Sequence, residues 1–217
     1  MSIAGFFRNG VDSDLHDFSN IIYDLYYQFS TCLSRPNTEY YVSQYQKGQN
    51  DAVSFLSNCD TVVLCTHGDK HGLYFDHGLH KYLIDLSNIS VIQDKCIVAI
   101  SCYTLYHNSI FRTPHNKSKV FLGFRDEFYL ATTPTNAPDE QSVVLDLYTD
   151  ILINAIVNVS ISGGTFQDLH DSIKLRVIEK GRDCSGFAAM FIDDALSRLD
   201  SVDLVGDGTT LFLPEPV

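Results

Sequence analysis

The chain has 217 residues, of which 45% are hydrophobic and 19% charged, as is typical of one folded domain with a sizeable core. Its formal net charge of −12 argues against a nucleic-acid partner, because nothing would offset the repulsion from phosphates. No apolar run approaches the roughly 20 residues that a membrane span needs, so we expect no membrane partner. Residues 1–10 hold a single basic residue and do not resemble a signal peptide, which predicts a cytoplasmic protein.

The cysteines are expected to be reduced thiols. Two of them, Cys65 and Cys96, fall inside apolar runs, where free cysteine behaves as a small hydrophobic residue. Without an export signal, disulfides are not expected. The six cysteines are Cys32, Cys59, Cys65, Cys96, Cys102 and Cys184.

The N-terminal part, residues 1–57, is expected to be helical. Apolar side chains recur every three or four positions through residues 14–33, which predicts an amphipathic helix capped by Asp12 or Ser13. Residues 38–57 predict a second helix, or a turn followed by a shorter helix, because a glycine interrupts the pattern.

The central part, residues 58–130, contains three short apolar runs at residues 61–66, 96–100 and 120–124. They are rich in β-branched residues and apolar at nearly every position, as are strands that are covered on both faces in a parallel sheet. Residues 72–86 predict a hairpin, because two apolar segments flank a short polar turn that contains a glycine.

The C-terminal part follows a polar stretch, residues 131–142, which predicts a surface loop or, alternatively, a processing or activation loop. Strands that alternate with helices predict an α/β fold with helices on both faces of the sheet, within a single domain of residues 1–217. Residues 141–158 predict a helix, and further helices are expected from Ser162 or Thr165 to about 180 and over 186–199. A short strand and turn over residues 202–208 and a terminal strand over 210–213 complete the C-terminal part, residues 143–217.

Reactive residues follow the first two apolar runs. His67 and Gly68 come after the first run, and Ser101 and Cys102 after the second. Ligands of open α/β sheets bind beyond the carboxyl ends of the strands, so we interpret Cys102 as a nucleophile and His67 as its base. The backbone N–H groups of Gly68 and Cys102 would form an oxyanion hole. The alternative is a buried polar histidine with a core cysteine.

This arrangement resembles the caspase-like cysteine peptidases, a group that includes caspases, metacaspases, gingipains, clostripain, separase and the bacterial CHAT proteins. The matching blocks are residues 62–68 and 97–102, with the hairpin between them. Residues 120–124 are similar to the strand that follows the nucleophile in the CHAT-like branch, and residues 204–207 are similar to a C-terminal Gly-Asp segment in gingipain-like members. The resemblance covers residues 55–130 best.

The resemblance implies a three-layer α/β/α sandwich around a mostly parallel sheet. It also implies an endopeptidase that forms a thioester acyl-enzyme, without a cofactor or metal. Cys102 would be the nucleophile and His67 the general base or acid, with the backbone of Gly68 and Cys102 as the oxyanion hole. No third catalytic residue is implied, because a backbone carbonyl often orients the histidine in this group.

The residue two positions before the cysteine departs from the pattern. Many relatives that cut after Arg or Lys carry Asp there and caspases carry Gln, whereas this chain has Ile100. We therefore expect an uncharged or apolar P1 residue, unless Asp126 or Glu127 enters the pocket. A pocket lined by Arg125 would instead favour an acidic residue. The expected substrate-binding residues are Ile100, Ser101, Arg125 and Asp126.

A metal site is the rival interpretation of the same stretch, because six candidate ligands crowd into sixteen residues. A zinc site needs about four ligands that converge in tetrahedral geometry, and the spacing here matches no standard zinc pattern. The simpler interpretation places the histidines of the hairpin on its exposed surface. The candidates are Cys65, His67, His71, Asp76, His77 and His80.

The sequence therefore predicts a caspase-like cysteine endopeptidase that cleaves a specific polypeptide, with a regulatory or activating protein as a further expected partner. By resemblance alone, a bacterial defence or cell-death system is a plausible setting. The alternative is a catalytically inactive caspase-fold module that binds a protein or regulates it through the same cleft.

Overall fold

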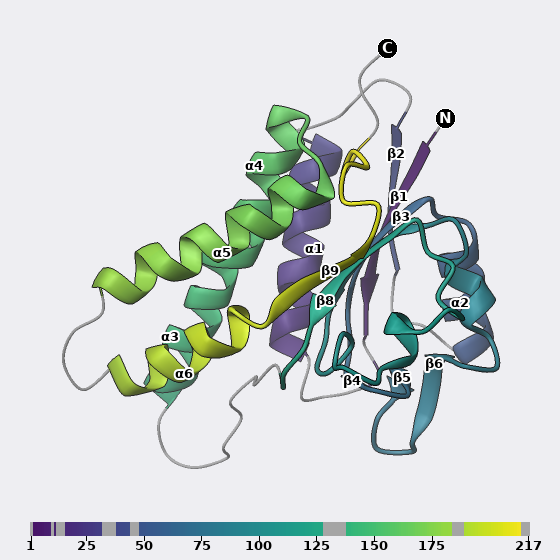
Figure 1. The fold of residues 1–217 in the computed structure, drawn as a ribbon, viewed down its shortest axis with the longest axis horizontal. Helices are drawn as coiled ribbons and strands as arrows, with labels where there is room; N and C mark the ends of the chain where they lie inside the picture. The colour runs from purple at the N-terminus through teal and green to yellow at the C-terminus, as the bar shows by residue number, and fades with distance from the viewer. Residues whose placement is uncertain are drawn as a thin grey trace.

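A six-stranded sheet forms the centre of the molecule, with strand order β2-β1-β3-β7-β8-β9 (Figure 1). The computed structural model describes residues 2–9, 11, 16–31, 38–43, 48–127, 138–183 and 189–213. Five strands run parallel and β9 pairs antiparallel with β8, so the predicted mostly parallel sheet is confirmed. The strands are β1 (Ser2–Arg8), β2 (Thr38–Val42), β3 (Thr61–Cys65), β7 (Cys96–Ile100), β8 (Val120–Phe124) and β9 (Val202–Gly206).

Helices cover both faces of this sheet, which confirms the three-layer α/β/α architecture (Figure 1). The layer on one side consists of α1, α3, α4, α5 and α6, and the other side carries α2 and a small second sheet. The helices are α1 (His16–Thr31), α2 (Gln49–Ser57), α3 (Pro138–Tyr148), a π-helical turn (Thr149–Ile153), α4 (Asn154–Ser162), α5 (Phe166–Asp183) and α6 (Ala189–Leu199).

Each central strand contributes to two hydrophobic cores, one on each face. On β3, Val63 and Cys65 pack into the larger core beneath α1 and α3–α6, whereas Val62 and Leu64 pack into the smaller core beneath α2. Successive side chains of a strand point to opposite faces, so a strand with both faces covered must be apolar throughout. The coverage of both faces explains why the three runs in the sequence are apolar at nearly every position.

The smaller sheet lies at the carboxyl end of β3 and has the order β4-β5-β6. Its strands are β4 (Gly68–Asp69), β5 (Gly72–Asp76) and β6 (Lys81–Asp85). The antiparallel β5–β6 pair is the predicted hairpin, while β4, which pairs Gly68 with Leu73, was not predicted. Two 3-10 turns, Ile89–Ile92 and Ile110–Arg112, complete this side of the molecule.

The N-terminal part differs from the expected all-helical segment, because it supplies two strands of the main sheet. Residues 2–8 form β1, which lies between β2 and β3, and residues 38–42 form β2 rather than the start of a helix. A short apolar run does not distinguish a strand from a helix by periodicity alone, and β2 is rich in residues that favour strands. The helix after Gly48 is the shorter one, α2. The proposed caps of α1, Asp12 and Ser13, lie outside the described residues.

Two further expectations near the C-terminus need correction. Residues 138–142 belong to α3 rather than to a loop, and residues 128–137 lie outside the described part. Proline is compatible with the first turn of a helix, so Pro138 can begin α3. The predicted terminal strand is reduced to one bridge between Leu211 and Thr165, because this segment packs against the start of α5 instead of the sheet.

One helical stretch, Val143–Ser162, is long and apolar enough to cross a membrane when judged by length and composition alone. The sequence expectation that no run approaches this length therefore needs correction. Within the structure 56% of its apolar window is buried, and Ile151, Ala155 and Ile156 lie in the larger core. The core helix of a globular protein has the same features.

Candidate functional site

The two predicted reactive residues follow neighbouring strands that pair in register. Strands β3 and β7 are parallel, and Cys65 pairs with Ile100 at their carboxyl ends. His67 lies two residues after Cys65, and Cys102 lies two residues after Ile100. Both residues therefore lie at the same edge of the sheet. Both side chains are half-buried. This is the edge at which open α/β sheets bind ligands.

Gly68 brings the two segments into direct contact. A Cβ atom at this position would overlap the Ser101 hydroxyl and would lie 2.9 Å from the carbonyl oxygen of Cys102. Only glycine allows the backbone after His67 to approach the backbone at Cys102 this closely. The structure thus places His67, Gly68, Ser101 and Cys102 at one edge of the sheet, and their chemical roles stay predictions.

Among the described cysteines, Cys102 differs from the others in exposure. Cys59, Cys65 and Cys96 are buried, whereas Cys102 is half-buried. Burial raises the pKa of Cys59 to about 11 and also raises the pKa of Cys96. Burial, and secondarily the charge of Cys102, raises the pKa of Cys65 far above its ordinary value. These three thiols are therefore expected to be unreactive near neutral pH.

The turn after Cys102 is held to the loop after β8. Tyr103 has a left-handed backbone with φ of 51°, a conformation that is uncommon for residues other than glycine. Its N–H donates to the carbonyl of Asp126 at 3.1 Å, and the N–H of Leu105 donates to Phe124 at 2.8 Å. These bonds keep the strained turn in place and thereby define the position of Cys102.

The His67 ring lies against the hairpin. Its ring centroid is 4.5 Å from that of His77, with an angle of 27° between the ring planes. The carbonyl of His67 accepts a hydrogen bond of 2.8 Å from the N–H of Tyr74. The simpler interpretation of the sequence places His77 on the exposed surface of the hairpin. The residue is exposed, but its stacking on His67 depends on tertiary structure and has no local sequence signal.

Asp69 is the centre of a hydrogen-bonded group beneath this hairpin. One carboxylate oxygen accepts from the N–H groups of His71 and Gly72 at 2.7 and 3.0 Å. The other oxygen accepts from the hydroxyls of Tyr74 and Tyr82 at 2.8 and 3.0 Å. Four donors on one carboxylate are a strong set of charge-assisted bonds, so they fix the segment that follows Gly68.

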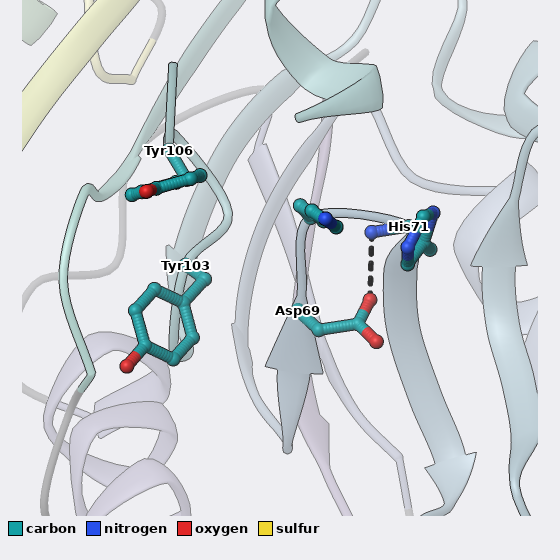
Figure 2. Close-up of a pocket in the computed structure, with 5 residues that line it drawn as sticks. Asp69, His71, Tyr103 and Tyr106 are labelled. Carbon is teal, nitrogen blue, oxygen red and sulfur yellow. Dashed lines mark hydrogen bonds between the residues drawn. The ribbon is translucent and has the colours of Figure 1, made fainter. Parts of the chain in front are cut away.

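A cavity of about 350 Å³ begins where the two reactive segments end. Figure 2 shows Tyr103 and Tyr106 on one side and Asp69 and His71 on the other, with Lys70 as the fifth lining residue. Tyr103 directly follows Cys102 and Asp69 directly follows Gly68, so the cavity adjoins the candidate site. The sequence does not indicate that these residues share a cavity, because only the fold brings the two segments together.

The four predicted substrate-binding residues are not among the residues that line this cavity. Ile100 and Ser101 are both buried, with 2% of each exposed. Arg125 is exposed, and its Nε lies 3.9 Å from a carboxylate oxygen of Asp203 on β9. Asp126 is exposed as well, and its N–H donates to the Ser201 hydroxyl at 3.2 Å. Their roles in substrate binding stay predictions.

The candidate metal ligands do not converge. Within the described residues, no group of three or more His, Cys, Asp or Glu side chains is placed to hold a metal ion. Cys65 is buried in the larger core, while His71, His77 and His80 are exposed on the small sheet. Although His67 stacks on His77, and the ring centroid of His77 lies 6.2 Å from that of His80, these described rings are not arranged as metal ligands.

The sheet order, the covering helices and the paired strand ends together define a caspase-like α/β fold. A solved structure with a similar fold is the complex of Porphyromonas gingivalis RgpB pro- and mature domains. The TM-score is 0.50 at 11% sequence identity, and the match covers 97% of this chain. This chain spans about half of that protein, because the match covers 48% of it. No family model matches the sequence, and no curated protein does.

Proposed function

We propose that this protein is a cysteine peptidase in which Cys102 is the nucleophile and His67 moves protons. The observation that carries this proposal is the convergence of His67-Gly68 and Ser101-Cys102 at the carboxyl ends of paired strands, where Gly68 packs against Cys102. The similarity to a gingipain structure supports the fold on which such a site is built.

The proposed reaction proceeds through an acyl-enzyme. His67 takes the proton of the Cys102 thiol, and the thiolate attacks the peptide carbonyl carbon. The oxyanion that forms would accept hydrogen bonds from the N–H groups of Gly68 and Cys102. As the C–N bond breaks, His67 returns the proton to the leaving amine and a thioester remains. His67 then deprotonates a water that attacks the thioester, which releases the acid and restores the thiol.

The cavity beside the site supports a polypeptide substrate. Its walls of Tyr103 and Tyr106 and its volume of about 350 Å³ suit one large side chain next to the bond that is cleaved. The proposed substrate is one specific protein, and a further protein would regulate or activate the peptidase. A cytoplasmic location and a role in bacterial defence or cell death are parts of the same proposal.

The first test is the alkylation of the intact protein at pH 7.5 with iodoacetamide and with a panel of peptidyl electrophiles of varied P1. Cys102 should react at least about tenfold faster than Cys59, Cys65 or Cys96, because burial raises the thiol pKa of those three. His67→Ala should remove this advantage. Peptide mapping by mass spectrometry gives the rate at each cysteine, and Cys102→Ala is the control.

The preferred P1 residue of the reactive probes would then be used in a peptide cleavage assay. Equal labelling of Cys102 and the buried cysteines would contradict the peptidase proposal. A reactive Cys102 that labels in the same way with and without His67 would contradict the dyad. Either result would favour the alternative, a caspase-fold module that binds a protein without cleaving it.

A further inference from the structure

The stacked pair of His67 and His77 connects the proposed base to the hairpin. His77 lies in the turn between β5 and β6, and its ring covers one face of the His67 imidazole with 4.5 Å between centroids. The nearly parallel planes, 27° apart, are those of a stacked aromatic pair. A ring in contact with one face of His67 restricts the rotation of that imidazole.

The ring of His77 is itself held in place. Tyr74 meets it edge to face at 4.9 Å, and Tyr74 in turn stacks on Tyr82 at 4.4 Å. The hydroxyls of both tyrosines donate to the Asp69 carboxylate, which also accepts two backbone N–H groups. A continuous series of contacts therefore runs from the anchored Asp69 through the tyrosines to His77 and His67.

The turn that carries His77 is also closed by local hydrogen bonds. The carboxylate of Asp76 accepts from the N–H of Leu79 at 3.0 Å, and the carbonyl of His77 accepts from the N–H of His80 at 3.1 Å. His80 has a left-handed backbone, with φ of 52°. The position of the His77 ring thus follows from a defined turn and not from a loose loop.

We infer that His77 is a positioning residue, which keeps the His67 ring in the orientation that serves Cys102. The inference rests on the proposed function. The bond from Tyr74 to the carbonyl of His67 fixes the backbone, and the stacked ring of His77 limits the side-chain torsions of His67. A general base must lie within hydrogen-bond reach of its proton, so a His67 ring that turns away from this orientation would lose much of its effect.

The test compares three variants with the wild-type protein: His77→Ala, which removes the ring; His77→Phe, which keeps a ring that can stack; and His80→Asn as the matched control. His80 lies in the same turn and its ring is 6.2 Å from that of His77. Asparagine tolerates the left-handed backbone of that position. For each protein, the rate of Cys102 alkylation by iodoacetamide is measured from pH 5 to pH 10, together with the thermal unfolding midpoint.

We expect His77→Ala to slow the alkylation of Cys102 about tenfold at pH 7.5, while His77→Phe stays within about threefold of wild type and His80→Asn is unchanged. The half-maximal rate of His77→Ala should move to higher pH, because a misplaced imidazolium stabilises the thiolate less. Among the described titratable groups, Cys65, Tyr103 and Tyr148 interact electrostatically with Cys102, and no variant replaces them.

The outcomes separate this inference from the proposed function. If His67→Ala slows the reaction but His77→Ala does not, the dyad stands and the positioning role is wrong. If His77→Phe is as slow as His77→Ala with an unchanged unfolding midpoint, stacking is not the cause, and the inference is again wrong. If Cys102 of the wild-type protein is no faster than Cys59, the proposed function fails and this inference fails with it.

Discussion

Gly68 shows how one residue without a side chain shapes the site. Its Cα faces the Ser101 hydroxyl and the Cys102 carbonyl so closely that no side chain fits between them. The Ser101 hydroxyl is buried and makes no hydrogen bond with any residue that the structure describes. The Ser101 hydroxyl therefore fills space beside Gly68, and close packing sets the distance between the two reactive segments.

We expect Gly68→Ala to lower the free energy of unfolding by about 1 to 3 kcal/mol, because the added methyl group overfills a packed position. Ser101→Ala alone should be close to neutral, since its hydroxyl has no described partner to lose. In the double variant, the loss should be smaller than the sum of the single losses by at least about 0.5 kcal/mol. Urea unfolding of the four proteins measures this coupling.

A strictly additive result would show that Gly68 and Ser101 do not compete for the same space. Some loss is expected to remain in the double variant, because the Cys102 carbonyl lies 2.9 Å from the added Cβ in either background. Alkylation of Cys102 in the same four proteins would show whether the reactivity of the thiol follows this packing.

At the scale of elements, helix α5 begins with a reciprocal pair of hydrogen bonds. The hydroxyl of Thr165 accepts from the N–H of Asp168 at 3.2 Å, and the Asp168 carboxylate accepts from the N–H of Thr165 at 2.7 Å. These bonds satisfy two N–H groups that the first turn of a helix leaves without intrahelical partners. Thr165 is one of the two starts that the sequence predicts for this helix, and it is confirmed.

Thr165→Ala should lower the free energy of unfolding by about 1 kcal/mol, whereas Thr165→Ser, which keeps the hydroxyl, should cost much less. The hydrogen bonds from the backbone and the side chain of Thr165 lower the pKa of Asp168. The stabilisation by the charged Asp168 carboxylate should thus be complete above its pKa of about 3.9 in the unfolded chain. This stabilisation should disappear as the pH falls through the lower pKa that Asp168 has in the folded protein.

The measurement is urea unfolding of wild type, Thr165→Ala and Asp168→Asn at several pH values between 2 and 7. The difference between wild type and Asp168→Asn should shrink as the solution is acidified. A difference that stays constant over this range would show that the charge of Asp168 does not contribute to the cap.

At the scale of the whole molecule, the sheet divides two cores of unequal size. The larger core lies beneath α1 and α3–α6, and the smaller one lies between the sheet, α2 and the hairpin that contacts His67. The segment Val143–Ser162 crosses the larger core, and its apolar character follows from this position. The candidate site lies at the carboxyl edge of the sheet, where the hairpin meets the ends of β3 and β7.

Two isoleucines of this segment test its assignment to the core. Ile156 is 1% exposed and Ile161 is 62% exposed. Ile156→Ala should lower the free energy of unfolding by about 2 to 5 kcal/mol because it leaves a cavity, while Ile161→Ala should change it by about 0.5 kcal/mol or less. Denaturant unfolding without detergent measures both. Equal losses, or no loss at Ile156, would contradict the packing of this helix on the sheet.

Local patterns predicted the elements that have a strong periodicity or complete burial. Strands β3, β7 and β8 stood out because both of their faces are covered, and α1, α5 and α6 because one face of each is apolar. Strand β1 was missed, although it lies inside the sheet, because seven residues do not distinguish a buried strand from a short helix. The final segment was taken for a strand, yet Phe212 and Leu213 are apolar because they fill the larger core.

The sequence by itself determined the apolar strands and the residues that follow them, because a strand that is buried on both faces needs an apolar residue at nearly every position. It therefore indicated His67, Gly68 and Cys102 without a structure. Only the tertiary structure decided the register of β3 with β7, the stacking of His77 on His67 and the walls of the cavity. Such contacts join residues that are distant along the chain, and they depend on how whole elements pack, which no local pattern records.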